Sequence, residues 1–576
     1  MTSLPSENDI LKYWDEIDAF HTLLEKTKDL PEYRFYDGPP FATGTPHYGH
    51  ILISILKDVV VRFFTMKGHH IPRRFGWDTH GLPIEHEVDK LHGIHGEADV
   101  QAMGIGNYNN ICRSIVMRCR EEWEHVISRI GRWIEFKDDY KTMDPSYMES
   151  VWYVFSQLWE KDLVYRGTKV MPWSTGLQTS LSNFEANQNY KDVSDPAIFI
   201  TFPLVDQPDV SLVAWTTTPW TLPSNLALVV HPEFDYVRLV VKETGKKLIV
   251  AQSRKGEQPE LPYEIEATFP GSNLKGLSYV PLFTFFKDRP NSFIIVCDTF
   301  VTSETGTGVV HCAPGFGEDD ARVGDLYKIV SPGNPPVCPI DGAGNFTKEV
   351  ATYAGQYVKD ADAAIIAELK ANNRLWSKSV VKHSYPFCWR SDTPLLYRAV
   401  PSWFVKVTEL KERLLVNNLK SKWVPENIQE GRFHNWLRDS RDWAISRSRF
   451  FGTPIPIWSN SDFSEIVVVS SVDHLEELSG TRISDLHRDH VDDIIIPSKN
   501  PNGEPLKRIP EVFDCWFESG SMPYASQHYP FTNPELFMNS FPADFVAEAL
   551  DQTRGWFYTM LVLSTALLTL PPLRTW

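Results

Sequence analysis

The stretch RFYDGPPFATGTPHYGHILISILKDVVVRFF, residues 34–64, decides the fold class of this chain. It predicts a short strand over 34–37, a Gly-Pro-Pro turn, and a long helix that begins near His47 and ends near Gly68. Apolar residues recur three and four positions apart along that helix, and a glycine follows where a C-terminal cap belongs. A strand followed in this way by a helix is typical of an α/β fold with a parallel sheet.

Two histidines at the start of this helix form a candidate phosphate site. His47 and His50 lie three residues apart, so their imidazoles share one face of the first turn. The first turn of a helix also has free backbone N–H groups and the positive end of the helix dipole, which attract a polyphosphate. A histidine pair at this spacing is by itself more often structural or metal-binding, so that alternative stays open on these residues alone.

A carboxylate follows the next predicted strand. Residues Ile71–Phe75 predict a strand that leads into GWDTHGLPIE, residues 76–85, where Asp78 precedes a glycine-bracketed loop. In open α/β sheets, ligands bind at the carboxyl ends of the strands. Asp78 is therefore a candidate for holding an ammonium group, while the helix terminus holds a phosphate.

The chain has 576 residues, 42% of them hydrophobic, and its predicted secondary structure changes in character twice along the sequence. We therefore expect more than one domain. Residues 1–184 predict an N-terminal helix and the first half of a doubly wound, Rossmann-like parallel sheet. Residues 185–388 contain short β-rich runs between turns, which predict an inserted barrel-like domain. Residues 389–576 are expected to complete the sheet and to carry a smaller connecting insertion around 466–508. The individual predicted elements are Met1–Phe20, Asn110–Ile134, Ser146–Lys161, Ala197–Leu204, Tyr236–Val241, Leu248–Ala251 and Phe293–Cys297.

Composition argues against several classes of protein. The seven cysteines include no C-x-x-C pair, which indicates free thiols in a reducing compartment and argues against a disulfide framework. The charged N-terminus resembles neither a signal peptide nor a mitochondrial presequence. The most apolar stretch, Trp556–Leu570, is short for a membrane span and predicts a buried helix. We therefore expect a cytoplasmic protein without a membrane anchor.

Seven motifs, taken together, resemble those of class I aminoacyl-tRNA synthetases, and the resemblance runs along nearly the whole chain. The string over 76–85 is similar to the isoleucyl branch, of the eukaryotic cytosolic type, rather than to the valyl or leucyl branches. The motifs are the His-x-Gly-His signature at 47–50 and the segments 76–85, 215–225, 306–320, 442–447, 514–521 and 548–557.

The resemblance implies that ATP, delivered as its magnesium complex, activates isoleucine for transfer to tRNA(Ile). His47 and His50 would act on the phosphates as catalytic residues, and no covalent protein intermediate is needed. By the same resemblance, Asp78 and the backbone near Gly38 hold the amino group of isoleucine. The residues expected to line the side-chain pocket or to meet the adenylate are Pro39, Trp516, Trp556, Glu548, Asp551 and Gln552.

The sequence departs from the family pattern at two places. Ala549 stands where the family commonly has glycine, so nucleotide binding is expected to weaken if that position needs a positive φ angle or a close backbone approach. In addition, no Lys-Met-Ser-Lys-Ser string occurs before Trp576. We therefore expect either a chain truncated before this loop and the anticodon-binding domain, or one with reduced synthetic activity, since losing a preorganised charge costs on the order of 100-fold in rate.

The inserted segment resembles an editing domain. One methylene separates isoleucine from valine, and a hydrophobic pocket extracts only about 1–3 kcal/mol from it, a limit for which isoleucyl-tRNA synthetase is the standard example. The resemblance therefore implies hydrolysis of valyl-tRNA(Ile), with Thr217 and Asp320 as catalytic residues and Asp320 holding the ammonium group. Three threonines in a row are by themselves typical of an ordinary strand. The residues expected at this site are Thr216, Thr217, Thr218, Asn225, His311 and Asp320.

Several alternatives remain: an editing-only aminoacyl-tRNA deacylase, a non-catalytic scaffold derived from a synthetase, and a simpler nucleotidyltransferase that uses the histidine pair. The partners implied are tRNA(Ile), isoleucine and ATP, for a monomer or a member of a multi-synthetase assembly. The formal net charge of −17 means that contact with tRNA needs a local basic face. Zinc is not expected, because Ser391 stands where a second ligand would follow Cys388.

Overall fold

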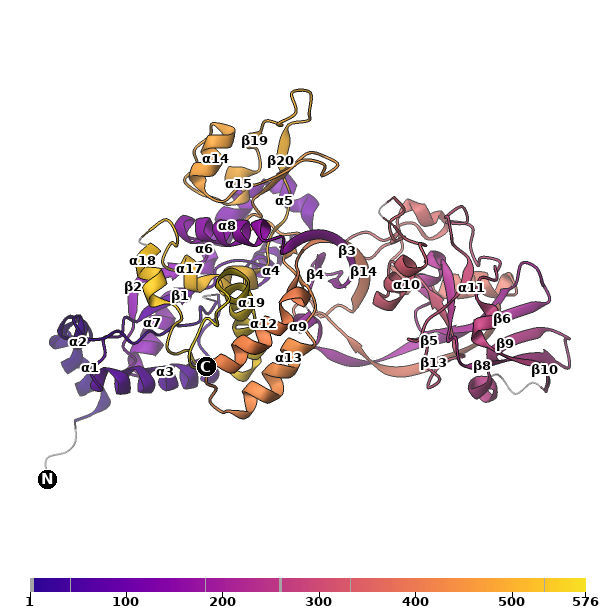
Figure 1. Cartoon of the computed structure of the whole chain (residues 1–576), viewed down its shortest axis with the longest axis horizontal. Coiled ribbons are helices and arrows are strands. Elements are labelled where there is room, and N and C mark those ends of the chain that lie inside the picture. Colours follow the sequence, from indigo (N-terminus) through magenta and orange to yellow (C-terminus); the bar gives the residue numbers. More distant parts are fainter. Residues whose placement is uncertain (1–4, 42, 182, 258–261, 332, 533) are drawn as a thin grey trace. The chain divides into compact units, whose positions relative to one another are not determined.

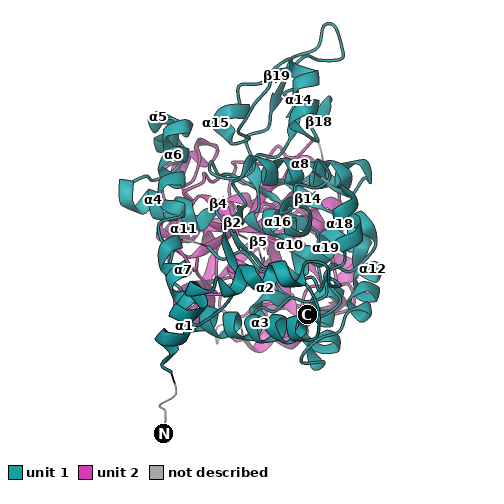
Figure 2. Cartoon of the chain, turned by 90° about the vertical axis from the view of Figure 1, so that its left-hand side faces the viewer, with its two compact units in different colours: residues 1–167, 402–576 teal, residues 168–401 magenta. Residues whose placement is uncertain are grey.

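The computed structural model describes residues 5–41, 43–181, 183–257, 262–331, 333–532 and 534–576. It divides into two compact units, residues 1–167 with 402–576 and residues 168–401 (Figure 1, Figure 2). The strands β3 (Val164–Ser174) and β14 (Leu395–Val405) contain the two boundaries along the chain. The two ends of the sequence thus build one unit, and the middle of the chain builds the other.

The first unit is organised around parallel strand contacts. β1 (Arg74–Trp77) pairs in parallel with β2 (Glu135–Lys141). Isolated parallel bridges join residues 32–41, the segment around Phe35, to the residues that flank β1. On the other side of this segment, Phe35 forms a parallel bridge with Phe545. The predicted strand over 34–37 lies at this position, so the predicted Rossmann-like parallel arrangement is confirmed. The parallel array has the order β2, β1, 32–41, 543–545, 573–575 and 422.

Three helices of this unit follow the sequence patterns closely. α3 (Tyr48–Met66) begins directly after His47, which is its N-cap. α8 (Pro145–Glu160) occupies the stretch predicted as Ser146–Lys161 and has proline at its first position, where a missing N–H costs nothing. α19 (Trp556–Leu568) is buried from Trp556 to Ala566, as expected for the most apolar stretch of the chain.

The single helix predicted over Asn110–Ile134 is wrong. The structure has two helices there, α6 (Ile105–Val116) and α7 (Arg120–Arg129). At the break between them, the side chains of Arg118 and Cys119 both donate hydrogen bonds to the carbonyl oxygen of Thr43. Tertiary contacts at the break thus override a helical pattern that is continuous in the sequence. The predicted N-terminal helix is likewise divided, because Asp18 has a left-handed φ of 45° between α1 (Glu7–Glu16) and α2 (Ala19–Thr27).

A small antiparallel sheet belongs to the same unit and has the strand order β18-β17-β20-β19. It carries the helices α14 (Val472–Ser479) and α15 (Arg488–Val491) and covers the stretch predicted as a connecting insertion (Figure 1). Its strands are β17 (Ile457–Ser459), β18 (Ile466–Val468), β19 (Ile495–Ile496) and β20 (Leu506–Arg508). No helix within the described part of the chain is both long and apolar enough to cross a membrane.

The first unit has further helices and strands. The helices are α4 (Leu82–His92), α5 (Glu97–Met103), α12 (Val407–Lys420), α13 (His434–Arg438), α16 (Cys515–Gly520), α17 (Met522–Ala525) and α18 (Pro534–Ser540). The strands are β15 (Trp443–Ala444), β16 (Ser446–Arg447) and β21 (Val512–Phe513).

The second unit is β-rich, as predicted, but its main sheet is open. Six strands run in the order β10-β8-β9-β6-β5-β13, so that β10 and β13 are edges and the described strands do not close into a barrel. A three-stranded sheet, β11-β7-β12, and the helices α10 (Glu318–Leu326) and α11 (Val358–Ala371) complete its core. The strands are β4 (Thr179–Ser180), β5 (Tyr190–Pro203), β6 (Val210–Thr216), β7 (Ala227–Val230), β8 (Asp235–Val241), β9 (Lys247–Ala251), β10 (Tyr263–Pro270), β11 (Ile294–Cys297), β12 (Val309–Cys312) and β13 (Leu375–Pro386), with helix α9 (Asn183–Ala186).

Candidate functional site

Three carboxylates gather at the carboxyl ends of neighbouring parallel segments. Asp37 ends the segment that contains Phe35, Asp78 follows β1 directly, and Glu548 lies shortly after Phe545. In open α/β sheets this edge is where ligands bind. The structure therefore brings Asp78 and Glu548, which are far apart in the sequence, to the same edge of the parallel array.

Gly38 contacts two of the predicted substrate-binding residues. Its N–H donates to Oε1 of Glu548 at 3.1 Å. A Cβ atom on residue 38 would lie 2.5 Å from that oxygen and 3.1 Å from the ring of Trp556. Trp556 is buried, and its indole N–H donates to the carbonyl oxygen of Ser519 at 2.8 Å. Glycine is therefore needed at this position for the close approach of the other two side chains.

The other predicted adenylate contacts lie around the start of α19. The side-chain oxygen of Gln552 accepts the N–H of Trp556 at 3.1 Å, and its amide donates to Asp551 at 2.9 Å. Trp516, in α16, packs so closely on Gly555 that a Cβ atom there would lie 3.0 Å from the indole ring. Residues predicted separately from two motifs thus lie against the same helix start.

Ala549, the departure from the family pattern, causes no backbone strain. Its φ and ψ angles are −69° and 159°, in the extended region that any residue adopts. Position 549 therefore does not need a positive φ angle. This was one of the conditions under which alanine was expected to weaken nucleotide binding.

Asp78 carries a buried carboxylate oxygen, Oδ1, for which the described residues supply no hydrogen-bond partner. Its backbone N–H donates to the carbonyl oxygen of Pro40 at 2.9 Å, which places Asp78 beside the predicted pocket residue Pro39. Burial raises the pKa of Asp78 well above its usual value, and an ionised Glu518 would add to this effect. A buried carboxylate oxygen without a partner is costly, and the positive charge of a ligand would favour the ionised form of Asp78.

His47 and His50 cap the helix that they begin. Nδ1 of His47 accepts the N–H groups of Gly49 and His50 at 3.1 and 3.4 Å, and Nδ1 of His50 accepts the N–H of His47 at 3.2 Å. The expectation that these first-turn N–H groups are free is therefore wrong, because the imidazoles satisfy them locally. The two rings stack with their centroids 3.6 Å apart.

This capping arrangement fixes the tautomers of both histidines. A neutral imidazole that accepts through Nδ1 carries its proton on Nε2, so both side chains can donate from Nε2 to a ligand. Burial, with the charges of His47 and Lys57, lowers the pKa of His50 to about 4. The pair can thus meet a phosphate with two aligned N–H donors, rather than with the backbone of the first turn.

A buried ionic cluster that the sequence motifs did not indicate lies next to these residues. Lys57 Nζ lies 2.6 Å from Asp37 Oδ1 and 2.5 Å from Glu548 Oε1, and Arg132 lies 2.6 Å from Asp37 Oδ2. Burial opposes ionisation of Asp37, but Arg132 and Lys57 together lower its pKa. Lys57 lies two turns after His50 and so on the same face of the helix, and a charge at that position was the available signal in the sequence.

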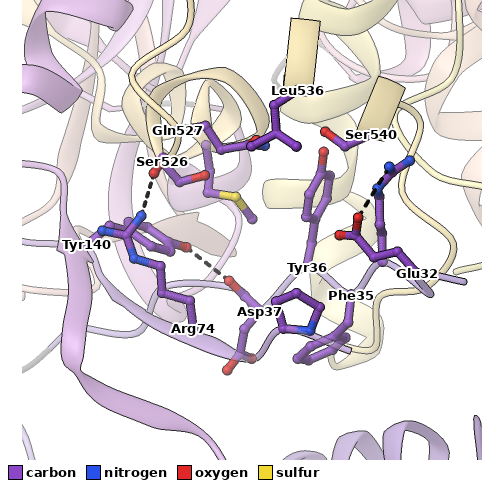
Figure 3. Close-up of a pocket in the computed structure, with 13 residues that line it drawn as sticks. Glu32, Phe35, Tyr36, Asp37, Arg74, Tyr140, Ser526, Gln527, Leu536 and Ser540 are labelled. Atoms are coloured by element: carbon purple, nitrogen blue, oxygen red, sulfur yellow. Dashed lines mark hydrogen bonds and ion pairs between the residues drawn. The ribbon is translucent and has the colours of Figure 1, made fainter. Parts of the chain in front are cut away.

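A separate cavity of about 250 Å³ lies elsewhere in the first unit (Figure 3). Its lining includes Tyr36, Arg74 and Gln527, and Asp37 is the member that it shares with the buried ionic cluster. The hydroxyl group of Tyr140 donates to the carbonyl oxygen of Asp37 at 3.0 Å in this wall. The cavity contains none of the residues predicted from the sequence to bind substrate.

In the second unit, the predicted editing threonines form a short hydrogen-bonded turn. Thr216 ends β6, and Thr218 precedes the short helix η1 (Pro219–Ser224). Oγ1 of Thr216 accepts the N–H of Thr218 at 3.1 Å and lies 3.2 Å from its hydroxyl group. Thr217 lies between them and is partly exposed. The three threonines therefore end a strand and begin a loop, which differs from the ordinary strand that Thr-Thr-Thr alone suggests.

A buried network supports this turn and fixes the tautomer of His311. The side-chain amide N–H of Asn225 donates to Nδ1 of His311 at 3.0 Å, so the ring carries its proton on Nε2, which lies 2.8 Å from Oγ1 of Thr221. The hydroxyl group of Tyr279 donates to Oδ1 of Asn225 at 2.6 Å. Burial lowers the pKa of His311 to about 4, which keeps the ring neutral. Thr221 and Tyr279 were not predicted, because no motif distinguishes them from other residues of their type.

Asp320 lies in the first turn of α10, next to the same region. Its Oδ2 accepts the N–H of Ala313 at 2.8 Å. Burial raises the pKa of Asp320 to about 7. The loop before it lies against the threonine turn, since the rings of Phe316 and Trp220 make an edge contact at 5.0 Å. The predicted editing residues therefore belong to neighbouring elements of one unit.

The family model for tRNA synthetases class I (I, L, M and V) matches residues 9–575, and the chain belongs to this family. The parallel array with its histidine-capped helix is thus the catalytic fold of a class I aminoacyl-tRNA synthetase. Among the described residues, no three His, Cys, Asp or Glu side chains cluster so that they could hold a metal ion.

The chain is most similar to isoleucine-specific members among the relatives compared. The cytoplasmic isoleucine–tRNA ligase of Arabidopsis thaliana is 57% identical over 599 residues, which cover 98% of this chain and 50% of that protein. The enzymes of the same name from Caenorhabditis elegans and Saccharomyces cerevisiae are 57% and 56% identical, over 99% and 98% of this chain and 50% and 53% of their own lengths. The resemblance to the isoleucyl branch is confirmed, and the chain spans about half the length of these relatives.

Proposed function

We propose that this chain carries the amino-acid-activating site of an isoleucine–tRNA ligase. The observation that carries the proposal is the buried Oδ1 of Asp78, without a hydrogen-bond partner among the described residues, at the carboxyl end of β1. An α-ammonium group would pair with it, and the relatives at 56–57% identity supply isoleucine as the amino acid. The product is isoleucyl-adenylate, from which tRNA(Ile) takes the amino acid.

The reaction proposed is attack of the isoleucine carboxylate on the α-phosphorus of ATP, with pyrophosphate as the leaving group. The protein forms no covalent bond in this step, so its contribution is positioning and charge stabilisation. Asp78 and the backbone at Gly38 would hold the amino group. Pro39, Trp516 and Trp556 would line the pocket for the isoleucine side chain.

The nucleotide would lie between the histidine pair and Glu548. His47 and His50 would each donate from Nε2 to the phosphates, whose charge also matches the N-terminal dipole of α3. Mg²⁺ would arrive with ATP as part of the substrate. Oε1 of Glu548 is held by Lys57 and by the N–H of Gly38, which leaves its other oxygen for a ribose hydroxyl. Asp551 and Gln552 would complete the adenylate contacts.

The test is isoleucine-dependent exchange between ATP and pyrophosphate, with valine and no amino acid as controls. We expect exchange that prefers isoleucine. Exchange that the Asp78→Asn protein supports equally well would contradict the proposed role of Asp78.

We propose a second activity, hydrolysis of valyl-tRNA(Ile) by the second unit. It is supported by the threonine turn, its network through His311 and Asn225, and the neighbouring Asp320. Thr217 would position water, and Asp320 would hold the ammonium group of the misacylated amino acid. Hydrolysis without any isoleucine-dependent exchange would favour the editing-only alternative, and the absence of both activities in a folded protein would favour the scaffold.

The expected setting follows from the relatives. Those compared above are named as cytoplasmic enzymes, and we propose the same location and the same tRNA(Ile), isoleucine and ATP as partners. We further propose that the chain is monomeric, which sedimentation of the purified protein would test.

A further inference from the structure

Four side chains of the first unit form one continuous hydrogen-bonded chain. Oε2 of Glu518 lies 2.6 Å from Nδ1 of His80, Nε2 of His80 lies 2.9 Å from Nε2 of His487, and Nδ1 of His487 lies 2.5 Å from Oδ1 of Asp485. Glu518, His80 and His487 are fully buried. None of them is used by the proposed mechanism, although His80 is only two residues from Asp78.

The Asp485 end of the chain sets the direction of its hydrogen bonds. Asp485 is held as a carboxylate by Arg113, at 2.9 Å from its Oδ2, and by the N–H of His487. A carboxylate only accepts, and two bare acceptor atoms do not approach to 2.5 Å, so a proton lies on Nδ1 of His487. Arg113 also lies 3.1 Å from Nδ1 of His487, but this contact is the longer of the two.

The positions of the remaining protons follow from the proton on Nδ1 of His487. Neutral His487 with its proton on Nδ1 accepts through Nε2, so the proton between the two rings belongs to His80. Nδ1 of His80 is then an acceptor, and Oε2 of Glu518 must donate to it. Oε1 of Glu518 accepts the N–H of Thr453 at 2.8 Å, which suits the carbonyl oxygen of a protonated carboxyl group.

Two other distributions have the same number of protons. If Glu518 gives its proton to Nδ1 of His80, the result is a Glu518 carboxylate beside a His80 imidazolium, and if His80 then passes the proton on Nε2 to His487, the imidazolium is His487. Either transfer creates two charges in a fully buried site, which burial opposes. The neutral form is supported further because burial raises the pKa of Glu518 to about 8 and lowers the pKa of His80 to about 3.

We propose that His80 and His487 are positioning residues that hold Glu518 as a neutral acid, so that Asp78 is the single unpaired anion at the ammonium site. The inference rests on the proposed function for its consequence in isoleucine binding, but the protonation of Glu518 does not depend on that function. An ionised Glu518 would place a second negative charge beside Asp78 and oppose its ionisation.

Two other carboxylates near this chain have charged partners, and a third, Asp144, accepts the backbone N–H of Lys141 at 2.8 Å. Glu85 accepts the N–H groups of Phe450 and Phe451 and contacts Arg449. Asp514 lies 3.0 Å from Arg447. Glu518 is thus the nearby carboxyl group whose side-chain partner is the histidine chain.

Infrared spectroscopy of the folded protein tests the proposal directly. A protonated carboxylic acid has a carbonyl stretch separate from the bands of carboxylates, and Glu518→Gln identifies the contribution of Glu518. At neutral pH we expect a buried acid band that Glu518→Gln removes. If no acid band is lost in Glu518→Gln, Glu518 is a carboxylate in the wild type and the proposal is overturned, whether or not the protein catalyses exchange.

Two substitutions of His487 then test the chain itself. His487→Gln keeps an oxygen acceptor for the N–H of His80, and we expect it to retain the acid band. His487→Phe removes the acceptor, so His80 should move its proton to Nδ1, Glu518 should ionise, and the acid band should disappear. An acid band that persists in folded His487→Phe overturns the role of His487. The wild-type spectrum remains decisive if this variant does not fold.

Exchange kinetics supply the functional readout. In His487→Phe we expect the KM for isoleucine to rise about tenfold for each unit by which the pKa of Asp78 increases, with the KM for ATP unchanged. The acid limb of the isoleucine profile should move to higher pH, because Asp78 must ionise against Glu518. Equal changes in both KM values would indicate a structural role and contradict the proposal. If the wild-type protein shows the acid band but no exchange, the result counts only against the proposed function.

Discussion

Lys57 Nζ lies 2.5 Å from Oε1 of Glu548, although 491 positions separate the two residues in the sequence. Lys57 belongs to the helix that begins with the histidine pair, and Glu548 belongs to the motif expected to meet the adenylate. The same ammonium group contacts Asp37, which also pairs with Arg132, so two cations balance the two carboxylates. One side chain therefore joins the phosphate side of the candidate site to its ribose side.

Replacing Lys57 with methionine should damage both stability and nucleotide binding. Breaking a buried ion pair by removing one partner costs about 3–5 kcal/mol, because Glu548 is left without its cation while Asp37 keeps only Arg132. We expect a lower midpoint of denaturation and a higher KM for ATP. Lys12→Met is the matched control, since Lys12 is 78% exposed and its pair with Glu16 is weak. Equal behaviour of the two variants would rule out this role.

Asp78→Asn should strongly reduce isoleucine activation without destabilising the fold. Losing the partner of a buried ammonium costs at least about 3 kcal/mol, or about 100-fold in the use of isoleucine. A carboxyl group whose pKa is raised on folding costs stability above its unfolded pKa, so the amide should leave the free energy of unfolding at pH 7 unchanged or larger. Exchange rates and thermal denaturation test both expectations. Asp493→Asn is the control, because Asp493 is exposed. A destabilised Asp78→Asn would assign Asp78 a structural role.

Two substitutions of His47 should separate helix capping from phosphate binding. His47→Ala removes the N-cap and should cost about 1 kcal/mol of stability. His47→Asn keeps a capping acceptor but loses the Nε2 donor, so stability should be preserved while the exchange rate falls about 100-fold. The comparison needs only denaturation curves and exchange rates of both proteins. Full exchange in His47→Asn would mean that the imidazole serves the helix alone.

Gly38→Ala should displace Glu548 and Trp556. The added Cβ atom would lie 2.5 Å from Oε1 of Glu548 with little room to relax, and a misplacement near 1 Å costs about 100-fold in rate. Gly44→Ala is the control, because no described atom lies within 4 Å of a Cβ atom there. Exchange kinetics of the two variants should differ strongly, and similar rates would show that the site tolerates the methyl group.

Hydrolysis of valyl-tRNA(Ile) should depend on Asp320 and on pH. The ammonium of the substrate needs an ionised carboxylate, and burial raises the pKa of Asp320 to about 7. The rate should therefore rise as the pH increases through about 7 and be lost in Asp320→Asn. Asp325→Asn is the control, since Asp325 lies in the same helix and its pair with Lys328 lies on the surface. A pH profile that is flat from 6 to 8 would contradict this assignment.

Sequence patterns predicted helices well where neighbouring residues determine their bounds. The apolar spacing of α3, its histidine start and the proline at the start of α8 all act within a few residues, so the bounds of these helices could be predicted. The prediction over Asn110–Ile134 was wrong because the break depends on a contact with Thr43, far away in the sequence. The open edges of the β-rich sheet likewise depend on strand pairing rather than on strand composition.

The sequence by itself determined the class of the protein and most of its candidate site residues, since motifs such as His47–His50 and Asp78 combine residue type with spacing. Only the tertiary structure decided how these residues work. The ion pairs of Lys57, the unpaired oxygen of Asp78 and the contact between His80 and His487 join segments that are distant along the chain. The physical reason is that backbone geometry and capping act over a few residues, whereas charge pairing and burial act between whatever segments the fold brings together.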